Sequence, residues 1–173
     1  LENGLAGGGW RDVPDISGCA SRDEVVELLR TIHVDNRDKT LLNWAAQLWA
    51  LKGRIEVGDT IVLPLKTTGQ VALGRCTSGY KYLDDPEPGK RHSIGVNWIR
   101  TDVSRAEFKQ DLLFSLGAFM TICRVSRNEA DKRIEKILNG SPDPGAELPT
   151  IPVQISGNEP DDILEQVDQV DVE

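Results

Sequence analysis

The stretch GDTIVLPLKTTGQVALGRCTSGYKY, from Gly58 to Tyr82, constrains the fold more than any other part of the chain. Two apolar segments, Thr60–Leu65 and Val71–Thr77, flank the polar turn KTTGQ, which is the pattern of a β-hairpin. Pro64 has no backbone N–H to give to a neighbouring strand. Its strand is therefore expected to lie at an edge of a sheet or to end there.

Further strands and helices follow the same kind of reasoning. Ser93–Arg100 reads as a third strand, and Leu5–Trp10 is a candidate for a fourth. Thr40 can cap one helix, and Gly140 is placed to end another. Three Ser-x-x-Glu capping boxes predict helix starts at 21–24, 104–107 and 126–129. The order of elements predicts an α+β fold, with a small twisted β-sheet or partial β-barrel and about four helices packed outside.

The charge of the chain is unevenly distributed. The net charge is −8, but seven of the 28 acidic residues and none of the 20 basic residues lie in 154–173. That leaves 21 acidic against 20 basic residues in 1–153, which allows a local basic patch. Residues 1–140 are expected to form the folded domain. Residues 141–173, rich in Pro, Gly and acid, are expected to be a linker toward a domain not present in this chain.

Several function classes find no support in the sequence. No run reaches the roughly 20 apolar residues of a membrane span, so no membrane partner is expected. Cys19, Cys76 and Cys123 are odd in number and widely spaced, which favours a reducing, cytoplasmic setting over disulfides or zinc. The two histidines have no metal-binding spacing, and no nucleophile elbow, P-loop or dinucleotide motif is found. We therefore expect a recognition domain rather than an enzyme, with no catalytic residue, metal or cofactor.

Four segments resemble, in the same order, the N-terminal region of Mrr-like, type IV-like restriction endonucleases. They are GGGWRDVPDIS, LLNWAAQLWAL, VGDTIVLPLKTTGQVALGRCTSGYKY and HSIGVNWIRTDVSRAEFKQDLLFSLGAFMTICRV. That region is similar to PUA-superfamily modules of the EVE and YTH kind. The resemblance implies a module that binds double-stranded DNA and accepts a flipped modified base, covalently linked to a nuclease domain beyond residue 173. Arg11 departs from the tryptophan-then-acid pattern of that family, and an upstream strand of the family is missing.

A reader of a modified base needs aromatic walls, because a flipped base must regain the stacking it loses. Trp10 follows three glycines, and Asp12 would share its side of an extended segment and could accept from cytosine N4. Trp44 lies on an amphipathic helix and is either core or pocket, with Asn43 beside it. The strand ending Thr77, Ser78, Gly79, Tyr80, Lys81 and Tyr82 places both tyrosines on one face and offers small donors. The expected base pocket is Trp10, Asp12, Asn43, Trp44, Thr77, Ser78, Gly79, Tyr80 and Tyr82.

Candidate phosphate contacts are the cations near these segments: Lys66, Arg75, Lys81, Lys90, Arg91 and His92. The simpler reading of each of them alone is a solvated charge. 5-Methylcytosine or 5-hydroxymethylcytosine is the first expectation for the modification, and methyladenine or a modified phosphate backbone is the alternative. A rival interpretation is a protein–protein or small-molecule sensor domain of a defence system. A nucleobase-sized pocket ringed by basic side chains would favour recognition of modified DNA, and a flat apolar patch would favour a sensor domain.

Overall fold

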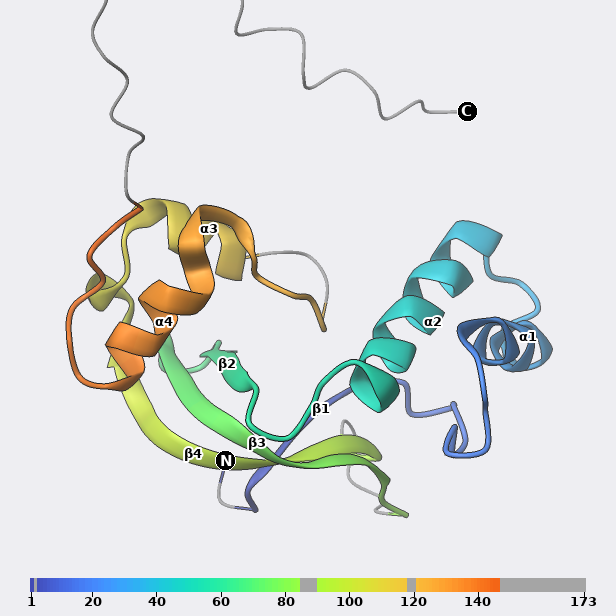
Figure 1. Ribbon diagram of the computed structural model, residues 1–173. Coiled ribbons are helices and arrows are strands. Elements are labelled where there is room, and N and C mark those ends of the chain that lie inside the picture. The colour runs from blue at the N-terminus through green and yellow to red at the C-terminus, as the bar shows by residue number, and fades with distance from the viewer. Residues whose placement is uncertain (2, 85–89, 118–120, 147–173) are drawn as a thin grey trace, which may run out of the picture.

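A computed structural model describes residues 1, 3–84, 90–117 and 121–146. Within them the order of elements is strand, two helices, three strands and two helices, with two short 3-10 turns (Figure 1). The elements are β1 Leu5–Gly8, α1 Arg22–Ile32, α2 Asp38–Gly53, β2 Thr60–Leu65, β3 Gln70–Tyr82, β4 His92–Ser104, η1 Arg105–Glu107, α3 Gln110–Leu116, η2 Arg127–Glu129 and α4 Ala130–Leu138. The expected α+β class is confirmed.

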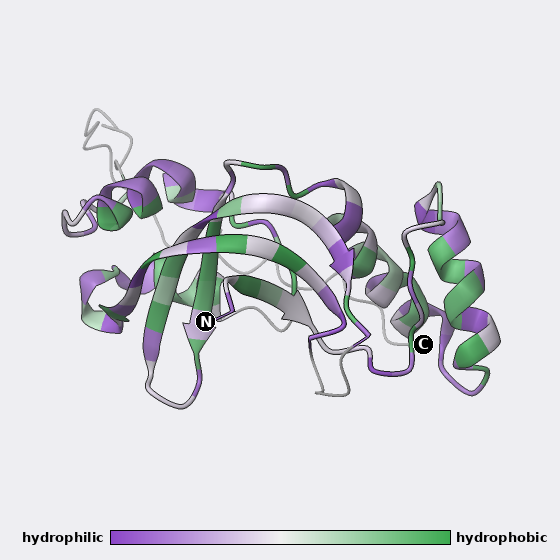
Figure 2. Cartoon of the chain, turned by 90° about the horizontal axis from the view of Figure 1, so that it is seen from below, coloured by the Kyte–Doolittle hydropathy of each residue, from purple (hydrophilic) through white to green (hydrophobic). Residues whose placement is uncertain are grey.

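The described strands form one antiparallel sheet in the order β1-β4-β3-β2. The predicted hairpin is β2–β3, and Gly69 provides the positive φ of +70° that its turn requires. Pro64 lies on β2, which is an edge strand, as its missing N–H predicts. β3 and β4 are each 13 residues long, longer than the sequence pattern suggested, and they curl into a half-barrel (Figure 2).

Irregular pairing between β3 and β4 accounts for the curl. The register shifts at four places along the pair, two of which lie between Cys76 and Lys81. Such bulges bend a strand and increase its twist. Gly74 and Gly95 permit close approach there, because a Cβ on Gly74 would lie 2.5 Å from Asn97 O and one on Gly95 2.4 Å from Ser78 Oγ. Gly79 lies within one of these bulges, between Ser78 and Lys81.

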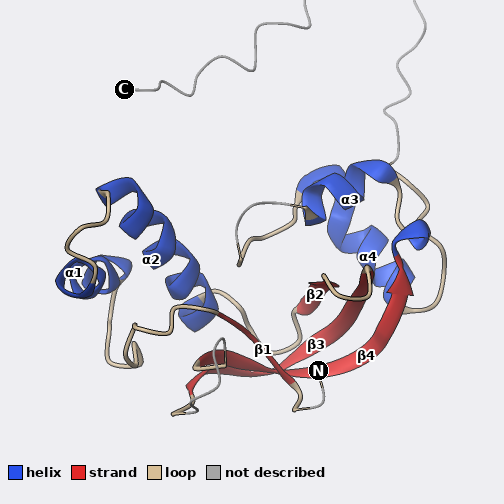
Figure 3. Ribbon diagram, turned by 180° about the vertical axis from the view of Figure 1, so that it is seen from behind, coloured by secondary structure: helices blue, strands red, loops and turns tan. Residues whose placement is uncertain are grey.

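Two groups of helices pack at opposite ends of the long β3–β4 ribbon (Figure 3). At one end α3 and α4 cover Val71, Leu73 and Val103. At the other end α1 and α2 form a core with the loop residues Val13 and Ile16. A third cluster joins α2 to the sheet through Leu51, Cys76, Ile94 and Val96. The loop that follows β1 is thus held between the sheet and α2.

Helix starts follow the sequence signals only in part. Ser21 caps α1 by accepting from Glu24 N at 3.2 Å, but the Glu24 carboxylate accepts from Ala20 N rather than from Ser21 N. The capping box at Ser104 is complete, yet it begins only η1. The prediction of Thr40 as a cap is wrong, because α2 begins at Asp38. The prediction of a capping box at 126–129 is also wrong, because the Ser126 side chain makes no capping hydrogen bond.

The folded part extends past the predicted boundary at residue 140. Gly140 does end α4, with φ +84°. Asp143, however, is only 4% exposed and accepts from Arg133 Nε and Nη2, each at 2.8 Å, and from Lys109 N. The packed chain therefore continues to Gly145, five residues past the expected boundary. Residues 147–173 of the expected linker lie outside the described residues.

Candidate functional site

A cavity of about 420 Å³ lies between the loop after β1 and helix α2. We call it the Trp10 cavity. Its volume is within the usual range for small-molecule sites, roughly 300–1,000 Å³. It is lined by Gly9, Trp10, Arg11, Asp12, His33, Asn43, Trp44, Gln47 and Thr121. Trp10, Asp12, Asn43 and Trp44, four of the nine expected pocket residues, are thereby brought together from two separate segments.

The backbone at Trp10 is held in an unfavourable conformation. Its φ is +48°, a region that residues with a side chain seldom adopt. The indole lies against the backbone of Gly8, where an added Cβ would come within 2.1 Å of the ring. Only glycine at position 8 leaves room for this placement. Strained residues of this kind cluster at functional sites, which supports a role for Trp10 beyond packing.

The opposite wall of the cavity comes from α2 and the end of α1. The ring of His33 meets Trp44 edge-on, with centroids 5.2 Å apart. Gln47 is buried: its amide nitrogen donates to Asn43 Oδ1 at 2.5 Å, and its oxygen accepts from Ile122 N at 3.0 Å. Trp44 also packs against the helical core, so it combines the two roles that the sequence left open. Asn43 and Asp12 are exposed at the cavity.

A buried hydrogen-bond network fixes the loop that carries Trp10 and Asp12. His92 is fully buried, with Nε2 3.0 Å from Val13 O and Nδ1 2.9 Å from the Tyr80 hydroxyl. The same hydroxyl lies 3.4 Å from both Ile16 N and Asp15 Oδ1. Because a carbonyl oxygen can only accept, the contact with Val13 places a proton on Nε2 of His92. In the neutral ring, Nδ1 then accepts from Tyr80.

Burial sets the protonation of this network. Desolvation lowers the pKa of His92, which outweighs the opposing effects of Val13 O and of the Asp15 carboxylate. Desolvation also raises the pKa of the Tyr80 hydroxyl well above its usual range. At neutral pH both groups are therefore uncharged. The Tyr80 hydroxyl keeps the proton that it donates to His92.

This network predicts a loss of stability in acid. The unfolded chain protonates His92 below about pH 6.5, whereas the folded protein resists protonation to a lower pH. The unfolded state binds more protons in that interval, so the free energy of unfolding should fall as pH decreases through it. We expect urea unfolding curves from about pH 7.5 to about pH 5 to show this fall. In His92→Gln the fall should be smaller, and an equal fall in both proteins would contradict the assignment.

The remaining expected pocket residues do not line the Trp10 cavity. Tyr80 lies beneath the loop, and Tyr82 packs edge-on against His92 with centroids 5.3 Å apart. Thr77 and Ser78 lie close against Gly95 in the β3–β4 pair, and the buried Ser78 Oγ has no partner among the described residues. Gly79 is part of the bulge. Of these residues, Tyr80 contacts the loop that carries Trp10, and Tyr80 and Tyr82 both contact His92.

The expected phosphate contacts are scattered. Arg75 pairs with Glu135 and donates to Thr60 Oγ1, and Lys66 lies in the hairpin turn. Lys81 is exposed on β3. Arg91 donates to Arg11 O at 3.0 Å, which places it beside the cavity, with Lys90 preceding it. His92 is a correction: it is buried inside the domain and is not a surface cation.

Sequence reasoning missed five residues that line the cavity. Arg11 was noted only as a departure from a pattern, and Gly9, His33, Gln47 and Thr121 were not selected. One signal was available for Gln47, because it follows Asn43 by four residues and shares its helix face. His33 ends α1 and Thr121 follows α3, so their approach depends on tertiary packing alone.

Fold and site together define a small α+β domain with a half-barrel sheet and a tryptophan-lined cavity. The chain belongs to the family described as Domain of unknown function (DUF8426), whose model matches residues 1–121. That range contains every lining residue of the Trp10 cavity. No curated protein and no solved structure matches the chain. Among the described residues, no helix is long and apolar enough to span a bilayer, and no cluster of potential metal ligands is found.

Proposed function

We propose that this chain is a DNA-binding module that holds a flipped, modified base in the Trp10 cavity. The observation that carries the proposal is the pairing of two indoles, Trp10 and Trp44, from separate segments around one cavity of suitable size. A base that leaves the duplex loses its stacking, and aromatic side chains restore it. The strained backbone of Trp10 and the room made by Gly8 support a dedicated placement of one wall.

Polar groups at the same cavity suit a base edge. Asp12 is an exposed carboxylate there, and carboxylates accept from the exocyclic amino group of cytosine. The Asn43 amide lies on the facing helix. A cytosine or an adenine carries such an amino group, whereas thymine does not. This chemistry favours 5-methylcytosine or 5-hydroxymethylcytosine, with methyladenine as the next candidate and a modified phosphate backbone as a further one.

Binding without chemistry is part of the proposal. The cavity brings together aromatic, amide and charged side chains, and we assign it a role in recognition alone. Any cleavage of the DNA belongs to a linked nuclease domain. A cytoplasmic setting, in a bacterial restriction system, is also proposed. The three free cysteines, Cys19, Cys76 and Cys123, fit a reducing compartment.

A panel of duplexes tests the function directly. Gel shifts would compare one sequence that is unmodified or carries 5-methylcytosine, 5-hydroxymethylcytosine, N6-methyladenine or a modified backbone linkage. We expect one modified duplex to bind at least tenfold more tightly than the unmodified one, which corresponds to about 1.4 kcal/mol. Equal binding of all duplexes would contradict base reading. No binding of any duplex would favour a protein or small-molecule sensor.

Salt should weaken the complex despite the acidic sequence pI of about 4.8. DNA releases condensed counterions when lysine and arginine neutralise its phosphates, so affinity falls as salt rises. Raising the salt from about 50 to about 200 mM should reduce affinity at least tenfold if only a few phosphates are contacted. Fluorescence anisotropy of a labelled duplex measures this. An affinity that does not change with salt would count against a nucleic-acid partner.

A further inference from the structure

The Arg11 guanidinium has no partner in the part of the chain that the structure describes. The side chain is exposed and lines the Trp10 cavity, and no hydrogen bond, ion pair or ring contact joins its guanidinium to a described residue. A charged side chain in the lining of a cavity is one of the few groups that can orient a ligand there. The proposed base-reading role gives Arg11 no task, so it is available to a ligand from outside the protein.

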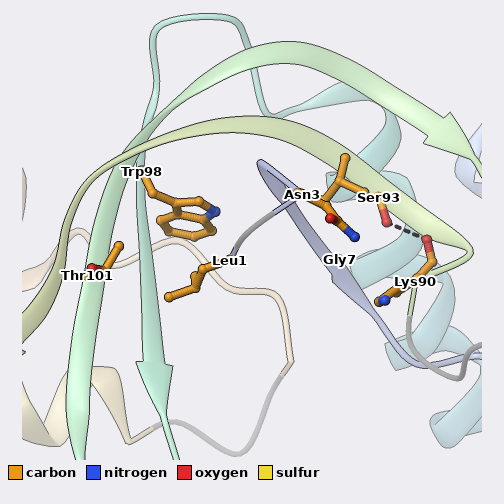
Figure 4. A pocket seen from close by; sticks show the side chains of 8 residues that line it. Leu1, Asn3, Gly7, Lys90, Ser93, Trp98 and Thr101 are labelled. Carbon is orange, nitrogen blue, oxygen red and sulfur yellow. Dashed lines mark hydrogen bonds between the residues drawn. The ribbon is translucent and has the colours of Figure 1, made fainter.

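The basic residues that the sequence singled out differ from Arg11 in this respect. Arg75 forms an ion pair with Glu135. Lys90 lines a different cavity, beside β1 and β4 (Figure 4), and Lys90 and Arg91 each interact with a further residue. Among the described residues, Arg11 is the only lysine or arginine in the lining of the Trp10 cavity.

Three hydrogen bonds hold the turn that carries Arg11. Trp10 O accepts from Val13 N at 3.1 Å, and Arg11 O accepts from Arg91 Nη1 at 3.0 Å. Val13 O accepts from Nε2 of the buried His92 ring at 3.0 Å. The backbone is therefore fixed while the Arg11 side chain extends from it into solvent. A fixed backbone reduces the conformational entropy that is lost when this side chain binds a ligand.

The position of Arg11 in the sequence decides what it meets in a complex with DNA. It lies between Trp10 and Asp12, the two residues of the loop that we assign to the base. A flipped base enters its cavity while its sugar and phosphates stay at the mouth, because the base remains tethered to the strand. An exposed guanidinium at this mouth suits a phosphate, since its planar fork can donate to two phosphate oxygens at once. The Asp12 carboxylate next to it repels phosphate and is left to the amino group of the base.

We propose that Arg11 binds a phosphate of the DNA strand at the mouth of the Trp10 cavity. The guanidinium donates to two oxygens of that phosphate and holds the strand where the base can enter. This inference rests on the proposed function, because it takes the bound polyanion to be the DNA whose base occupies the cavity. A phosphate carries no information about the base, so Arg11 contributes affinity and not discrimination.

The test compares Arg11→Gln with the parent in anisotropy titrations of modified and unmodified duplex at several salt concentrations. Loss of one phosphate contact reduces the slope of log affinity against log salt by about one. We expect that reduction with both duplexes, with roughly tenfold weaker binding at about 50 mM salt and an unchanged ratio between the duplexes. Arg11→Lys keeps the charge and loses the fork, so it should restore the slope and only part of the affinity.

Arg22→Gln is the matched control. Arg22 is exposed, has no printed contact with a described residue and begins α1, whose other end leads to His33 in the cavity lining. The eleven residues of α1 span about 16 Å, which exceeds the Debye length of about 10 Å at 0.1 M salt. The same change of charge there should leave the slope and both affinities unchanged. An equal loss in Arg22→Gln would show that only the general charge of the domain matters, and the proposal would fail.

The outcomes separate this inference from the proposed function, provided that each variant keeps the melting curve of the parent. If Arg11→Gln leaves the slope unchanged while the modified duplex is still preferred, the inference is overturned and base reading is retained. If the slope falls but the parent does not distinguish the duplexes, the phosphate contact is supported and base reading fails. If Arg11→Gln removes the preference without changing the slope, Arg11 reads the base and the phosphate assignment is overturned. If no duplex binds to the parent, both proposals are overturned.

Discussion

Trp10→Ala is expected to remove most of the preference for modified duplex while leaving binding to unmodified duplex nearly intact. The substitution deletes one aromatic wall of the Trp10 cavity. Stacking of a base on an aromatic side chain is worth about 1–3 kcal/mol, which corresponds to a roughly 5- to 150-fold loss of affinity. The loss should fall on the modified duplex, because only the modified base occupies the cavity productively. Anisotropy titrations with paired duplexes that differ in one base give the measurement.

Gly8 and Gly18 provide a matched pair of variants. In Gly8→Ala the new Cβ would lie 2.1 Å from the indole, so the ring must move, although every cavity side chain is retained. We expect it to reproduce the loss seen for Trp10→Ala. In Gly18→Ala, on the same loop but outside the cavity lining, the new Cβ meets nothing within 4 Å, so discrimination should be unchanged. Each variant must keep the wild-type melting curve. If Trp10→Ala folds normally and discriminates as well as the parent, Trp10 is not a wall of the base site.

Lys81→Ala separates base reading from backbone contact. Lys81 is exposed on β3, and Tyr80 and Tyr82 point to the other side of that strand. If it contacts phosphate, its loss should weaken modified and unmodified duplex equally, because phosphates carry no information about the base.

The parts of the fold that were predicted from sequence depend on local chemistry. Thr60–Leu65 is a strand at the predicted bounds because a short apolar run and the turn that follows it set its ends. Pro64 lies on an edge strand because it cannot donate. The start of α4 was predicted wrongly because left-handed backbone at residues 128–129 precedes it. Arg133 Nη1 donates to Asn128 O at 3.1 Å, and Asn128 and Glu129 both have positive φ, so Ser126 does not cap.

In the site, pairs of residues close in the sequence could be predicted, and contacts between distant segments could not. Trp10 and Asp12 could be paired from the sequence because they are two residues apart, and Asn43 and Trp44 because they are neighbours. That these two pairs face one another depends on how α2 packs against the loop, which no local pattern specifies. His92 was read as a surface cation because its neighbours Lys90 and Arg91 are basic. Its burial follows from the pairing of β4 with β1, where His92 lies opposite Gly8.

The second large effect is expected from Asp143→Ala, which should lower the free energy of unfolding by about 3–5 kcal/mol. Arg133 is 2% exposed, and Asp143 accepts from both its Nε and its Nη2. Removing the carboxylate leaves a buried guanidinium with one remaining carboxylate, Asp111, which is partly solvated. Losing one partner of a buried ion pair costs far more than the pair contributes, because the other charge stays desolvated. Asp102→Ala, at an exposed position on β4, should change stability by less than about 0.5 kcal/mol.

Truncated chains test the same contact in another way and bear on how the domain is prepared for binding studies. A chain ending at residue 140 lacks Asp143 and should be destabilised about as much as Asp143→Ala, whereas a chain ending at residue 146 should unfold like the full chain. Replacing Arg133 by Met together with Asp143 by Leu removes the buried charges and should recover much of the loss, since apolar replacements of buried pairs are often neutral. Urea unfolding monitored by tryptophan fluorescence measures the free energy of unfolding of each of these proteins. If the chain ending at residue 140 were as stable as the full chain, Asp143 would not be part of the fold, and the domain would end at Gly140 as the sequence first suggested.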